Sequence, residues 1–498
     1  MPDPRWPSIG FFDTPSRWGR QRPIANFRRA VNHSPIVVDT HDDSEGPRLH
    51  PAGPLGQHLV VALECDRPLA GGARFSLAGI ERVTIGRGDA RGATRRDGPV
   101  QTLDVRIPGR SLSMAQARLI RMGFSWAIED LGSTNGTFVD GERVTRLALS
   151  PEAIFEVGHT FLRVASFALP ADAPVDLDSW EVLDAFTTLD GTFGTEIERV
   201  TRLVGGGVPA LIVGESGTGK EVLARHLHAQ MARPGAFVAV NCGALPAPLV
   251  ESQLFGHVRG AFSGAVRDEV GLVRAAHQGT LFLDEIADLP KSSQAALLRV
   301  LQEHEVVPVG ATRPVAVDVR VLAATHQPLE ALVERGEFRK DLYARVAACI
   351  IELPPLRERR DDLGILVAAL LRKLTADVGA IAFTPRVGRA LLTYGWPSNV
   401  RELEQCLATC VALRRGRPID APELPPKVAA ILQSLLPPNR ASSALLGERD
   451  ERLRLDLLEH LSKCQGNVTD VARAMGKPRT QIHRWCKRFS VDPNVFRN

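Results

Sequence analysis

The residues best suited to chemistry form a glycine-rich run, GESGTGKE, at positions 214–221. It follows an apolar run at 210–213 and precedes a helical pattern, which is the context of a phosphate-binding loop. Glycines let the backbone approach a phosphate closely, and the amides at a helix N-terminus attract anions. Lys220 adds a positive charge, while Glu221 stands where the general loop has serine or threonine. The run predicts an ATP site built from Gly214, Glu215, Ser216, Gly217, Thr218, Gly219, Lys220 and Glu221.

A second acidic element completes this chemistry. The apolar stretch GTLFLDE at 279–285 predicts a buried strand that ends in two carboxylates. Asp284 would hold Mg²⁺, directly or through water, and Glu285 would polarise the attacking water. The two runs together predict hydrolysis of ATP to ADP and phosphate.

A third run, GAFSGA at 260–265, has the composition of a projecting loop. Its two glycines permit unusual backbone angles, and an exposed Phe262 makes sense mainly if a partner receives the ring. The run closely resembles the GAFTGA loop of sigma-54-dependent activators, which are AAA+ enhancer-binding proteins. The resemblance implies that sigma-54 is contacted by Gly260, Ala261, Phe262, Ser263, Gly264 and Ala265, with serine in place of the family's threonine.

Other stretches resemble the same family in the same order. In VNCGAL at 240–245, the resemblance implies that Asn241 restrains Glu285 until ATP is sensed. FRKDLYARV at 338–346 resembles the arginine-finger segment, so Arg339 and Arg345 would reach the γ-phosphate in a neighbouring subunit.

The remaining motifs concern nucleotide sensing. In VLAATHQPL at 321–329, His326 stands where the family's sensor strand has asparagine. LPPLRER at 353–359 and WPSNVREL at 396–403 resemble later motifs, and Arg401 would contact the nucleotide from the lid.

Two stretches nearer the N-terminus, TIGRG at 84–88 and DLGSTNGTFVDGERV at 130–144, resemble forkhead-associated (FHA) domains, which bind phosphothreonine peptides. The resemblance implies that Arg87 and Ser113 hold the phosphate, and that Asn135, with Thr134 beside it, holds the peptide backbone. The family's Ser-Arg-x-His loop reads Ser-Met-Ala-Gln at 113–116. The expected partner is a phosphothreonine protein or a Ser/Thr kinase. The alternative is a sandwich kept for packing or oligomer contacts.

The last segment has the pattern of a helix-turn-helix. Asn467 and Asp470 form a capping pattern, and one apolar face is expected from Leu453, Leu457, Leu458 and Leu461 and another from Ile482, Trp485 and Phe489. The segment resembles a Fis-type helix-turn-helix, whose outward face enters the DNA major groove. The outward residues are Thr480, Gln481, Arg484 and Lys487.

The elements that must position these residues follow from the pattern of apolar residues. We expect a disordered leader (1–55), an all-β FHA sandwich (56–168), a linker (169–185), an α/β AAA+ P-loop ATPase with a helical lid (186–425), a second linker (426–448) and an all-α helix-turn-helix (449–498). Buried parallel strands are expected at PALIVG, FVAVN, GTLFLDE and VRVLAAT.

The composition of the chain indicates the cellular environment in which it is expected to act. Of the 498 residues, 44% are hydrophobic, and no apolar run reaches the roughly 18–20 residues that a membrane helix needs. The seven cysteines are scattered, which fits a reducing cytoplasm rather than a disulfide or metal framework. The net charge of +4 is too small to indicate nucleic-acid binding by the chain as a whole.

The expected function is ATP-dependent activation of sigma-54 RNA polymerase holoenzyme by a homo-oligomer, with dimers on enhancer DNA and a hexamer as the working ring. One alternative is a DNA-bound phosphopeptide scaffold whose ATPase is weak or silent. A second is a remodelling ATPase that acts on another protein.

Overall fold

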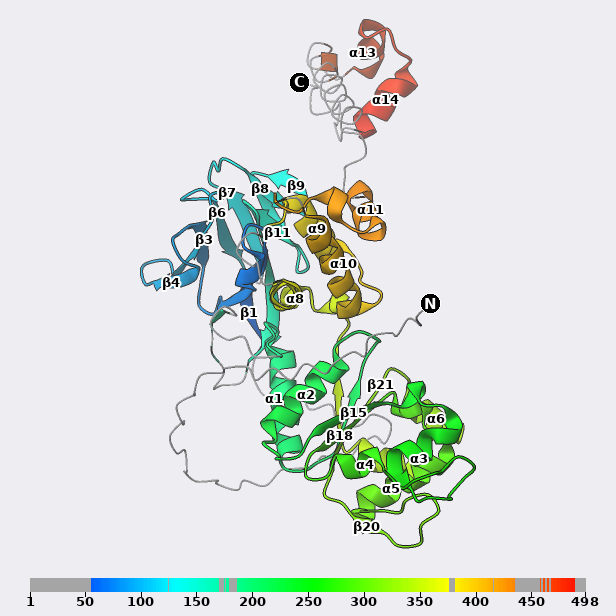
Figure 1. Cartoon of the computed structure of the whole chain (residues 1–498). Coiled ribbons are helices and arrows are strands. Elements are labelled where there is room, and N and C mark those ends of the chain that lie inside the picture. Colours follow the sequence, from blue (N-terminus) through cyan, green and yellow to red (C-terminus); the bar gives the residue numbers. More distant parts are fainter. Residues whose placement is uncertain are drawn as a thin grey trace, which may run out of the picture. The chain divides into compact units, whose positions relative to one another are not determined.

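The computed structural model describes residues 55–123, 125–169, 174, 176–178, 186–375, 381–414, 416–434, 457, 460–461, 464 and 467–488. Nearly all of the expected leader and the second half of the expected linker at 426–448 therefore lie outside the described residues. The described residues form an N-terminal β-sandwich, a central α/β unit, a set of helices that follows it, and two C-terminal helices (Figure 1).

The sandwich is built from two sheets with the strand orders β13-β2-β1-β12-β11-β8-β9 and β10-β7-β6-β3-β5-β4. All neighbouring pairs are antiparallel except β3 and β5, which are parallel. The strands are β1 (Leu55–Glu64), β2 (Ala73–Ser76), β3 (Arg82–Arg87), β4 (Gly92–Arg96), β5 (Thr102–Ile107), β6 (Ala117–Met122), β7 (Ser125–Asp130), β8 (Thr137–Val139), β9 (Glu142–Val144), β10 (Arg146–Leu149), β11 (Phe155–Val157), β12 (Thr160–Ala168) and β13 (Leu177–Asp178).

Apolar residues that alternate along these strands meet between the two sheets, with Leu59, Val105, Leu119 and Phe155 among the fully buried ones. The short 3-10 helix η1 (Pro68–Ala70) follows β1. One strand was not expected: β13 lies in the segment 169–185, which the sequence indicates as a linker, and it pairs with β2 at the sheet edge.

The central unit contains a five-stranded sheet in the order β15-β18-β21-β14-β22, in which every pair is parallel. The strands are β14 (Ala210–Val213), β15 (Phe237–Asn241), β18 (Thr280–Asp284), β21 (Arg320–Thr325) and β22 (Cys349–Glu352). The four expected parallel strands are confirmed, and β22 was not foreseen. Because all five strands run the same way, their carboxyl ends meet at one edge of the sheet, and ligands of such sheets bind there.

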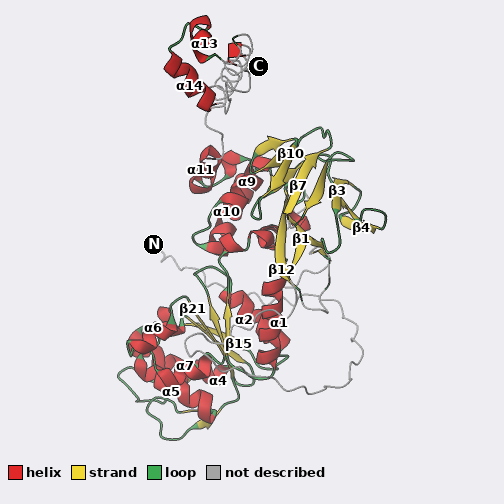
Figure 2. Ribbon diagram, turned by 180° about the vertical axis from the view of Figure 1, so that it is seen from behind, coloured by secondary structure: helices red, strands yellow, loops and turns green. Residues whose placement is uncertain are grey.

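Helices and short hairpins connect these strands. They are α1 (Gly191–Gly205), α2 (Lys220–Gln230), η2 (Cys242–Ala244), η3 (Ala247–Leu249), α3 (Val250–Phe255), β16 (Gly256–His257), β17 (Glu269–Val270), α4 (Leu272–Ala275), η4 (Ile286–Asp288), α5 (Lys291–Glu303), β19 (Glu305–Val306), β20 (Val315–Ala316), α6 (Leu329–Glu334) and α7 (Lys340–Val346). Figure 2 shows helices beside the strands of this sheet.

The helical lid follows β22. Its elements are η5 (Leu356–Glu358), η6 (Arg360–Asp362), α8 (Leu363–Leu374), α9 (Pro385–Thr393), α10 (Asn399–Leu413), η8 (Ala421–Glu423) and α11 (Pro426–Ser434). Helix α11 occupies the start of the segment 426–448, which the sequence indicates as a linker. The lid core contains the buried Trp396, whose indole N–H donates to the carbonyl of Leu391 over 2.9 Å.

The lid helices also contact the sandwich. Helix α8 lies beside β1, and one continuous hydrophobic cluster contains residues of each (Figure 1). The C-terminal helices are α13 (Val468–Ala474) and α14 (Arg479–Arg488).

Candidate functional site

The glycine-rich run connects the carboxyl end of β14 to the first residue of α2. Gly217 and Gly219 have φ angles of 79° and 104°, which side chains with a Cβ rarely adopt. A Cβ on Gly217 would also lie 2.3 Å from the carbonyl oxygen of Ser398, so the loop passes closely beneath the lid. The Lys220 ammonium group is buried and donates to the carbonyl of Gly214 over 2.9 Å. The loop therefore has the curled shape and the lysine that phosphate binding requires.

The two carboxylates lie at the end of β18, at the same edge of the sheet. One carboxylate oxygen of Glu285 is 3.6 Å from the Lys220 ammonium nitrogen. The other oxygen lies 2.7 Å from Nδ1 of His326 and accepts the His326 backbone N–H over 3.2 Å. Burial, and then the negative charge of Glu285, raise the pKa of Asp284 above its ordinary value.

This crowding of negative charge suits a cation. Among the described residues, no group of three or more His, Cys, Asp and Glu side chains could form a complete metal cage. Mg²⁺ is commonly held through one or two carboxylates together with the phosphates of its nucleotide. Asp284 fits such a partial site, and Lys220 lies on the side where phosphates would complete it.

Asn241 ends β15 and lies opposite Asp284 in the parallel register. Its side-chain oxygen accepts the backbone N–H of Ala244 over 3.1 Å and so caps η2. The Glu285 carboxylate is bonded here by His326. The restraint of Glu285 by Asn241 until ATP is sensed stays a prediction.

The lid reaches the phosphate-binding loop through several polar contacts. The Arg401 guanidinium donates to the Ser216 hydroxyl over 3.0 Å, which places the expected sensor beside the loop. Arg357 donates to both carboxylate oxygens of Glu215, at 2.7 and 3.0 Å. The buried Asn399 donates to Glu215 and to the Ser216 carbonyl, each over 3.0 Å.

These contacts change the electrostatics of the loop. Hydrogen bonds from Arg357 and then from Asn399 lower the pKa of Glu215 to about 2. No role for Arg357 or Asn399 was expected from the sequence, although they lie in the stretches 353–359 and 396–403, which resemble family motifs. Each side chain can be assigned only when the folded chain brings those stretches onto the loop.

A mainly apolar cavity of ≈ 290 Å³ lies next to the phosphate-binding loop. Thr218, Gly219 and Val222 form its loop side, and Ile365, Leu366 and Val400 form its lid side. Phe186, Thr187, Arg359, Ala369 and Arg372 complete the wall. An apolar cavity beside a phosphate site is what a nucleobase requires.

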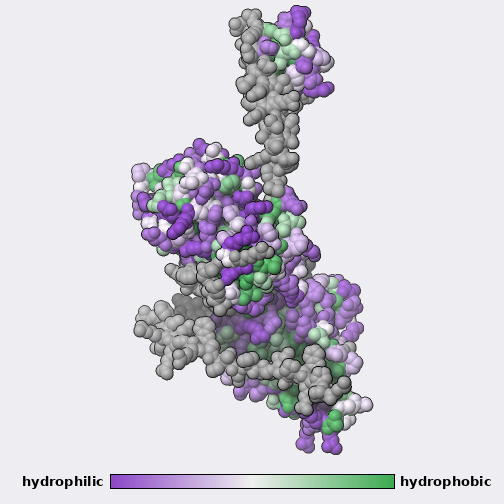
Figure 3. All heavy atoms as spheres, turned by 45° about the horizontal axis from the view of Figure 1, so that its top comes forward, coloured by the Kyte–Doolittle hydropathy of each residue, from purple (hydrophilic) through white to green (hydrophobic). Residues whose placement is uncertain are grey.

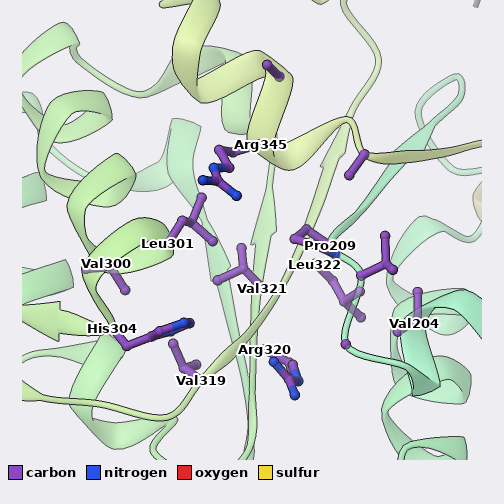
Figure 4. Close-up of a pocket in the computed structure, with 14 residues that line it drawn as sticks. Val204, Pro209, Val300, Leu301, His304, Val319, Arg320, Val321, Leu322 and Arg345 are labelled. Carbon is purple, nitrogen blue, oxygen red and sulfur yellow. The ribbon is translucent and has the colours of Figure 1, made fainter.

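The two candidate finger arginines lie apart from this nucleotide site. Arg339 precedes α7 and pairs with Asp341 over 2.6 Å. Arg345, in the last turn of α7, lines another cavity of ≈ 290 Å³ with His304, Arg320 and Val321. Figure 4 shows Arg345 extending toward Leu301 and Val321. This cavity lies at the amino ends of β14 and β21, the opposite edge of the sheet from Lys220.

The loop at 260–265 lies between β16 and β17. Gly260 and Gly264 have φ angles of 83° and 104°, so both glycines adopt the left-handed conformation expected of a projecting loop. The Phe262 side chain is 38% exposed, and its ring packs 4.9 Å from the ring of His257. The exposed tip fits the expected docking role.

The sandwich brings its four expected phosphopeptide residues to one end. The backbone N–H of Arg87 donates to the carbonyl of Ser113 over 2.9 Å, and the Ser113 hydroxyl accepts the N–H of Thr134 over 3.2 Å. Asn135 donates to the carbonyl of Ser111 over 2.7 Å. Arg87 itself is exposed.

Gln116 holds these loops together and was not assigned a role from the sequence. It is fully buried, accepts the Ser113 N–H over 3.0 Å and donates to the Gly136 carbonyl over 2.9 Å. The residue that departs from the family's histidine therefore bonds both loops. The sequence signal was its place in the Ser-x-x-His pattern.

Comparison with known proteins identifies the family of the chain. Family models match for the sigma-54 interaction domain at residues 188–352, the AAA+ ATPase lid domain at 357–438 and the FHA domain at 83–158. The transcriptional regulatory protein GlrR of Escherichia coli strain K12 is 39% identical over 333 residues, which cover 66% of this chain and 73% of that protein. The chain belongs to the sigma-54-dependent transcriptional regulators.

Two further similarities were found. The acetoin catabolism regulatory protein of Cupriavidus necator is 40% identical over 385 residues, which are 74% of this chain and 56% of that protein. The crystal structure of NtrX from Brucella abortus in complex with ATP covers 61% of this chain and 69% of its own, with 30% identity and a TM-score of 0.44. The matches to the sigma-54 interaction domain and to the AAA+ ATPase lid domain show that the central domain of this regulator is an AAA+ ATPase.

The C-terminal helices of the regulator follow the expected pattern where they are described. Asn467 caps α13 by accepting the Thr469 N–H over 3.1 Å. Ile482 and Trp485 are buried, whereas Thr480 and Arg484 are exposed and Gln481 is half-buried. Lys487 lies in α14, and Leu453, Leu458 and Phe489 lie outside the described residues.

No helix in the described part of this regulator is long and apolar enough to span a membrane. Hydrophilic residues predominate on the sandwich face visible in Figure 3.

Proposed function

We propose that this regulator binds enhancer DNA, assembles into a ring and hydrolyses ATP with Mg²⁺ to remodel the closed complex of sigma-54 RNA polymerase. The observation that carries the proposal is the convergence of Lys220, Glu285 and His326 at the edge of the sheet, under a lid that supplies Arg401. The exposed Phe262 belongs to the same domain, so hydrolysis and the docking loop share one scaffold.

The chemistry follows from these positions. Lys220 and the loop amides would hold the β- and γ-phosphates, and the adjacent apolar cavity would take the adenine. Glu285 would accept a proton from the attacking water as the new P–O bond forms and the bond to ADP breaks. Mg²⁺, held through Asp284, would neutralise phosphate charge. The products are ADP and inorganic phosphate.

The remaining roles concern assembly and control. Arg339 and Arg345 would act on the nucleotide of a neighbouring subunit, since Arg345 lies at the far edge of its own sheet. Thr480, Gln481, Arg484 and Lys487 would enter the major groove of DNA. Arg87, Ser113, Thr134 and Asn135 would receive a phosphothreonine peptide, and the cytoplasm is the expected setting.

The test compares Glu285→Gln with the wild-type chain and with Glu334→Gln, which alters an exposed glutamate at the end of α6. Each would be assayed for nucleotide binding, ATP turnover and open-complex formation with sigma-54 holoenzyme on a supercoiled promoter. Loss of a positioned general base typically costs about 10²–10⁴-fold in rate. We therefore expect Glu285→Gln to bind nucleotide and lose turnover and open complexes, with Glu334→Gln unaffected.

Retained turnover in Glu285→Gln would refute the role of this carboxylate. Turnover in the wild-type chain without open complexes would favour another client. An absence of turnover in the wild-type chain would favour the alternative function, a DNA-bound phosphopeptide scaffold whose ATPase is weak or silent.

A further inference from the structure

The sandwich and the lid share one hydrophobic core. Ala62, Leu63, Cys65 and Phe161 of the sandwich belong to the same buried cluster as the lid residues Leu363, Val367, Leu371, Phe383, Val387 and Leu391. Each of these side chains is at most 4% exposed. A continuous buried cluster of this kind resembles the interior of a single domain more than a contact between tethered domains.

Polar contacts reinforce the core. The backbone N–H of Phe383 donates to the carbonyl of Cys65 over 2.8 Å, and Arg372 donates to the carbonyl of Leu69 over 2.7 Å. Arg389 pairs with Glu156 at 2.7 Å, and the Glu156 side chain is only 5% exposed. Removing one partner while the two parts stay docked would leave a buried charge unpaired, which is costly, so the pair makes the docked arrangement sensitive to a change at either residue.

Two glycines in the lid helices mark how closely the surfaces approach. A Cβ on Gly364 of α8 would lie 2.4 Å from the carbonyl oxygen of Ala62. A Cβ on Gly388 of α9 would lie 2.4 Å from Cε2 of Phe161 and 2.5 Å from Sγ of Cys65. The nearest atoms at both positions belong to the sandwich or its adjoining turn, so no side chain fits between the two parts.

Leu189 connects the packed sandwich and lid to the cavity beside the phosphate-binding loop. This fully buried side chain packs in a cluster with Val60 and Phe167 of the sandwich and Ile365 of the lid. Its carbonyl accepts a hydrogen bond from Arg74 over 3.0 Å, and its N–H donates to Asp362 over 2.7 Å. Ile365 also lines the cavity next to the phosphate-binding loop.

A second connection runs through Asp362. Its carboxylate accepts hydrogen bonds from Arg359, at 2.9 and 3.1 Å. The Arg359 guanidinium lies 5.6 Å from the ring centroid of Phe186, and both residues line the same cavity. The wall of the cavity thus includes residues that the sandwich helps to hold.

We infer that the sandwich and the lid form one body and that their docking shapes the nucleobase side of the nucleotide site, so the docking of the sandwich and the affinity for nucleotide are coupled. The coupling is reciprocal: whatever shifts the sandwich changes nucleotide affinity, and nucleotide changes the docking by the same factor. The use of this coupling by a phosphothreonine signal rests on the proposed function, whereas the coupling itself does not.

Gly388→Ala offers a sharp test because α9 does not line the cavity. Alanine is the better helix former, so the lid helix is maintained while the added methyl group clashes with Phe161 and Cys65. Gly205→Ala in α1 is the matched control, since nothing lies within 4 Å of the added Cβ. The full chain would be titrated with the fluorescent nucleotide MANT-ADP, and hydrogen exchange would report docking at Phe383 and in β1.

We expect Gly388→Ala to speed exchange at the interface and to weaken MANT-ADP binding about fivefold or more, the lower end of typical coupling between sites. Gly205→Ala should change neither. A second variant, Arg389→Glu, places like charges together at Glu156, and Glu156→Arg in the same chain should restore both readouts.

Faster exchange at the interface with unchanged or tighter MANT-ADP binding would overturn the inference. Unchanged exchange in both Gly388→Ala and Arg389→Glu would also overturn it, because the docked arrangement would then not exist in solution. The assay needs neither a phosphopeptide nor polymerase, so a failure here is distinct from a failure of the proposed function.

Discussion

The Glu285 carboxylate lies between a lysine at 3.6 Å and a histidine at 2.7 Å. Its backbone adopts a left-handed φ of 52°, a conformation that non-glycine residues adopt mainly where the surrounding structure holds them. The imidazole and the peptide N–H of His326 both bond one carboxylate oxygen. This arrangement fixes where the proton acceptor lies relative to the phosphate-binding loop.

His326 is therefore expected to position Glu285. In His326→Ala the carboxylate keeps the backbone hydrogen bond and the ion pair with Lys220 but loses the imidazole, and loss of a hydrogen bond to a charged group costs about 1.5–3 kcal/mol. If this free energy is lost from the transition state, kcat falls roughly 10- to 100-fold. His326→Asn should retain most of the turnover, since an amide can also donate to the carboxylate.

Steady-state ATP turnover and MANT-ADP affinity would separate positioning from binding. The control is Gln327→Ala, which removes a neighbouring side chain bonded to Asp288 instead. An unchanged kcat in His326→Ala would contradict the role.

The sequence predicted residues whose role depends on local geometry. The loop at 214–221 and the acids at 284–285 combine a short-range pattern with an adjacent strand, so both could be placed in advance. The partners of Glu215 could not, because Arg357 and Asn399 are more than 140 residues away and meet it only when the lid folds over the loop. The same holds for His326, since the sequence placed it near nucleotide and not against Glu285.

At the scale of elements, the loops of the sandwich depend on one buried amide. Gln116 satisfies a donor in the loop at 113–116 and an acceptor at Gly136. A glutamine supplies both functions at once, so the departure from histidine leaves the loops bonded.

Gln116→Ala would leave the buried Gly136 carbonyl and the half-buried Ser113 N–H without this partner. We expect a loss of about 1–3 kcal/mol in the free energy of unfolding of the sandwich, and weaker binding of any phosphothreonine peptide. Gln116→His should restore part of the stability. Chemical denaturation and peptide titration are the measurements, with Met114→Ala as an exposed control in the same loop. Equal stability of Gln116→Ala and the wild-type chain would refute this prediction.

Strands that form continuous apolar runs could be predicted from the sequence, whereas the short strands β13 and β22 could not. The four foreseen parallel strands are short apolar runs, which is the pattern of buried parallel strands, and three of them end in a polar residue. Strand β22 has only four residues and alternates in burial, so its place beside β14 comes from tertiary pairing. Strand β13 has two residues and exists only because β2 offers an open edge.

At the scale of the whole molecule, the central sheet separates two functions. Lys220, Asp284 and His326 follow the carboxyl ends of their strands, while Arg345 lies near the amino end of β22. A strand advances about 3.3 Å per residue, so the four-residue β22 keeps the two edges roughly 13 Å apart. The arginine is thus placed for the nucleotide of another subunit.

Mixing two inactive variants tests this arrangement. Lys220→Ala lacks the phosphate contact and Arg345→Ala lacks the finger, so each alone should be inactive. In mixed rings some sites combine an intact pocket with an intact finger, and random mixing restores about a quarter of the sites. Adding the double variant to Lys220→Ala should restore none. Mixed rings seen by native mass spectrometry without turnover would contradict action in trans.

The docking of the sandwich on the lid was not visible in the sequence, which instead indicated a linker between two independent domains. Burial patterns report that a residue is inside, but not which distant element covers it. Phe161 and Cys65 fit an ordinary sandwich core, and only the folded chain shows that lid residues pack against them.

This packing has a consequence for inheritance. A sensor that hangs on a linker can be replaced by recombination, because its loss exposes nothing. Removal of this sandwich would expose Val367, Val387 and Leu391 of the lid to water and leave the glycines at 364 and 388 facing empty space. The sandwich and the lid are therefore expected to be exchanged together in evolution or not at all. Regulators with this sandwich should keep glycine at positions 364 and 388, whereas relatives with other sensor domains can replace these glycines.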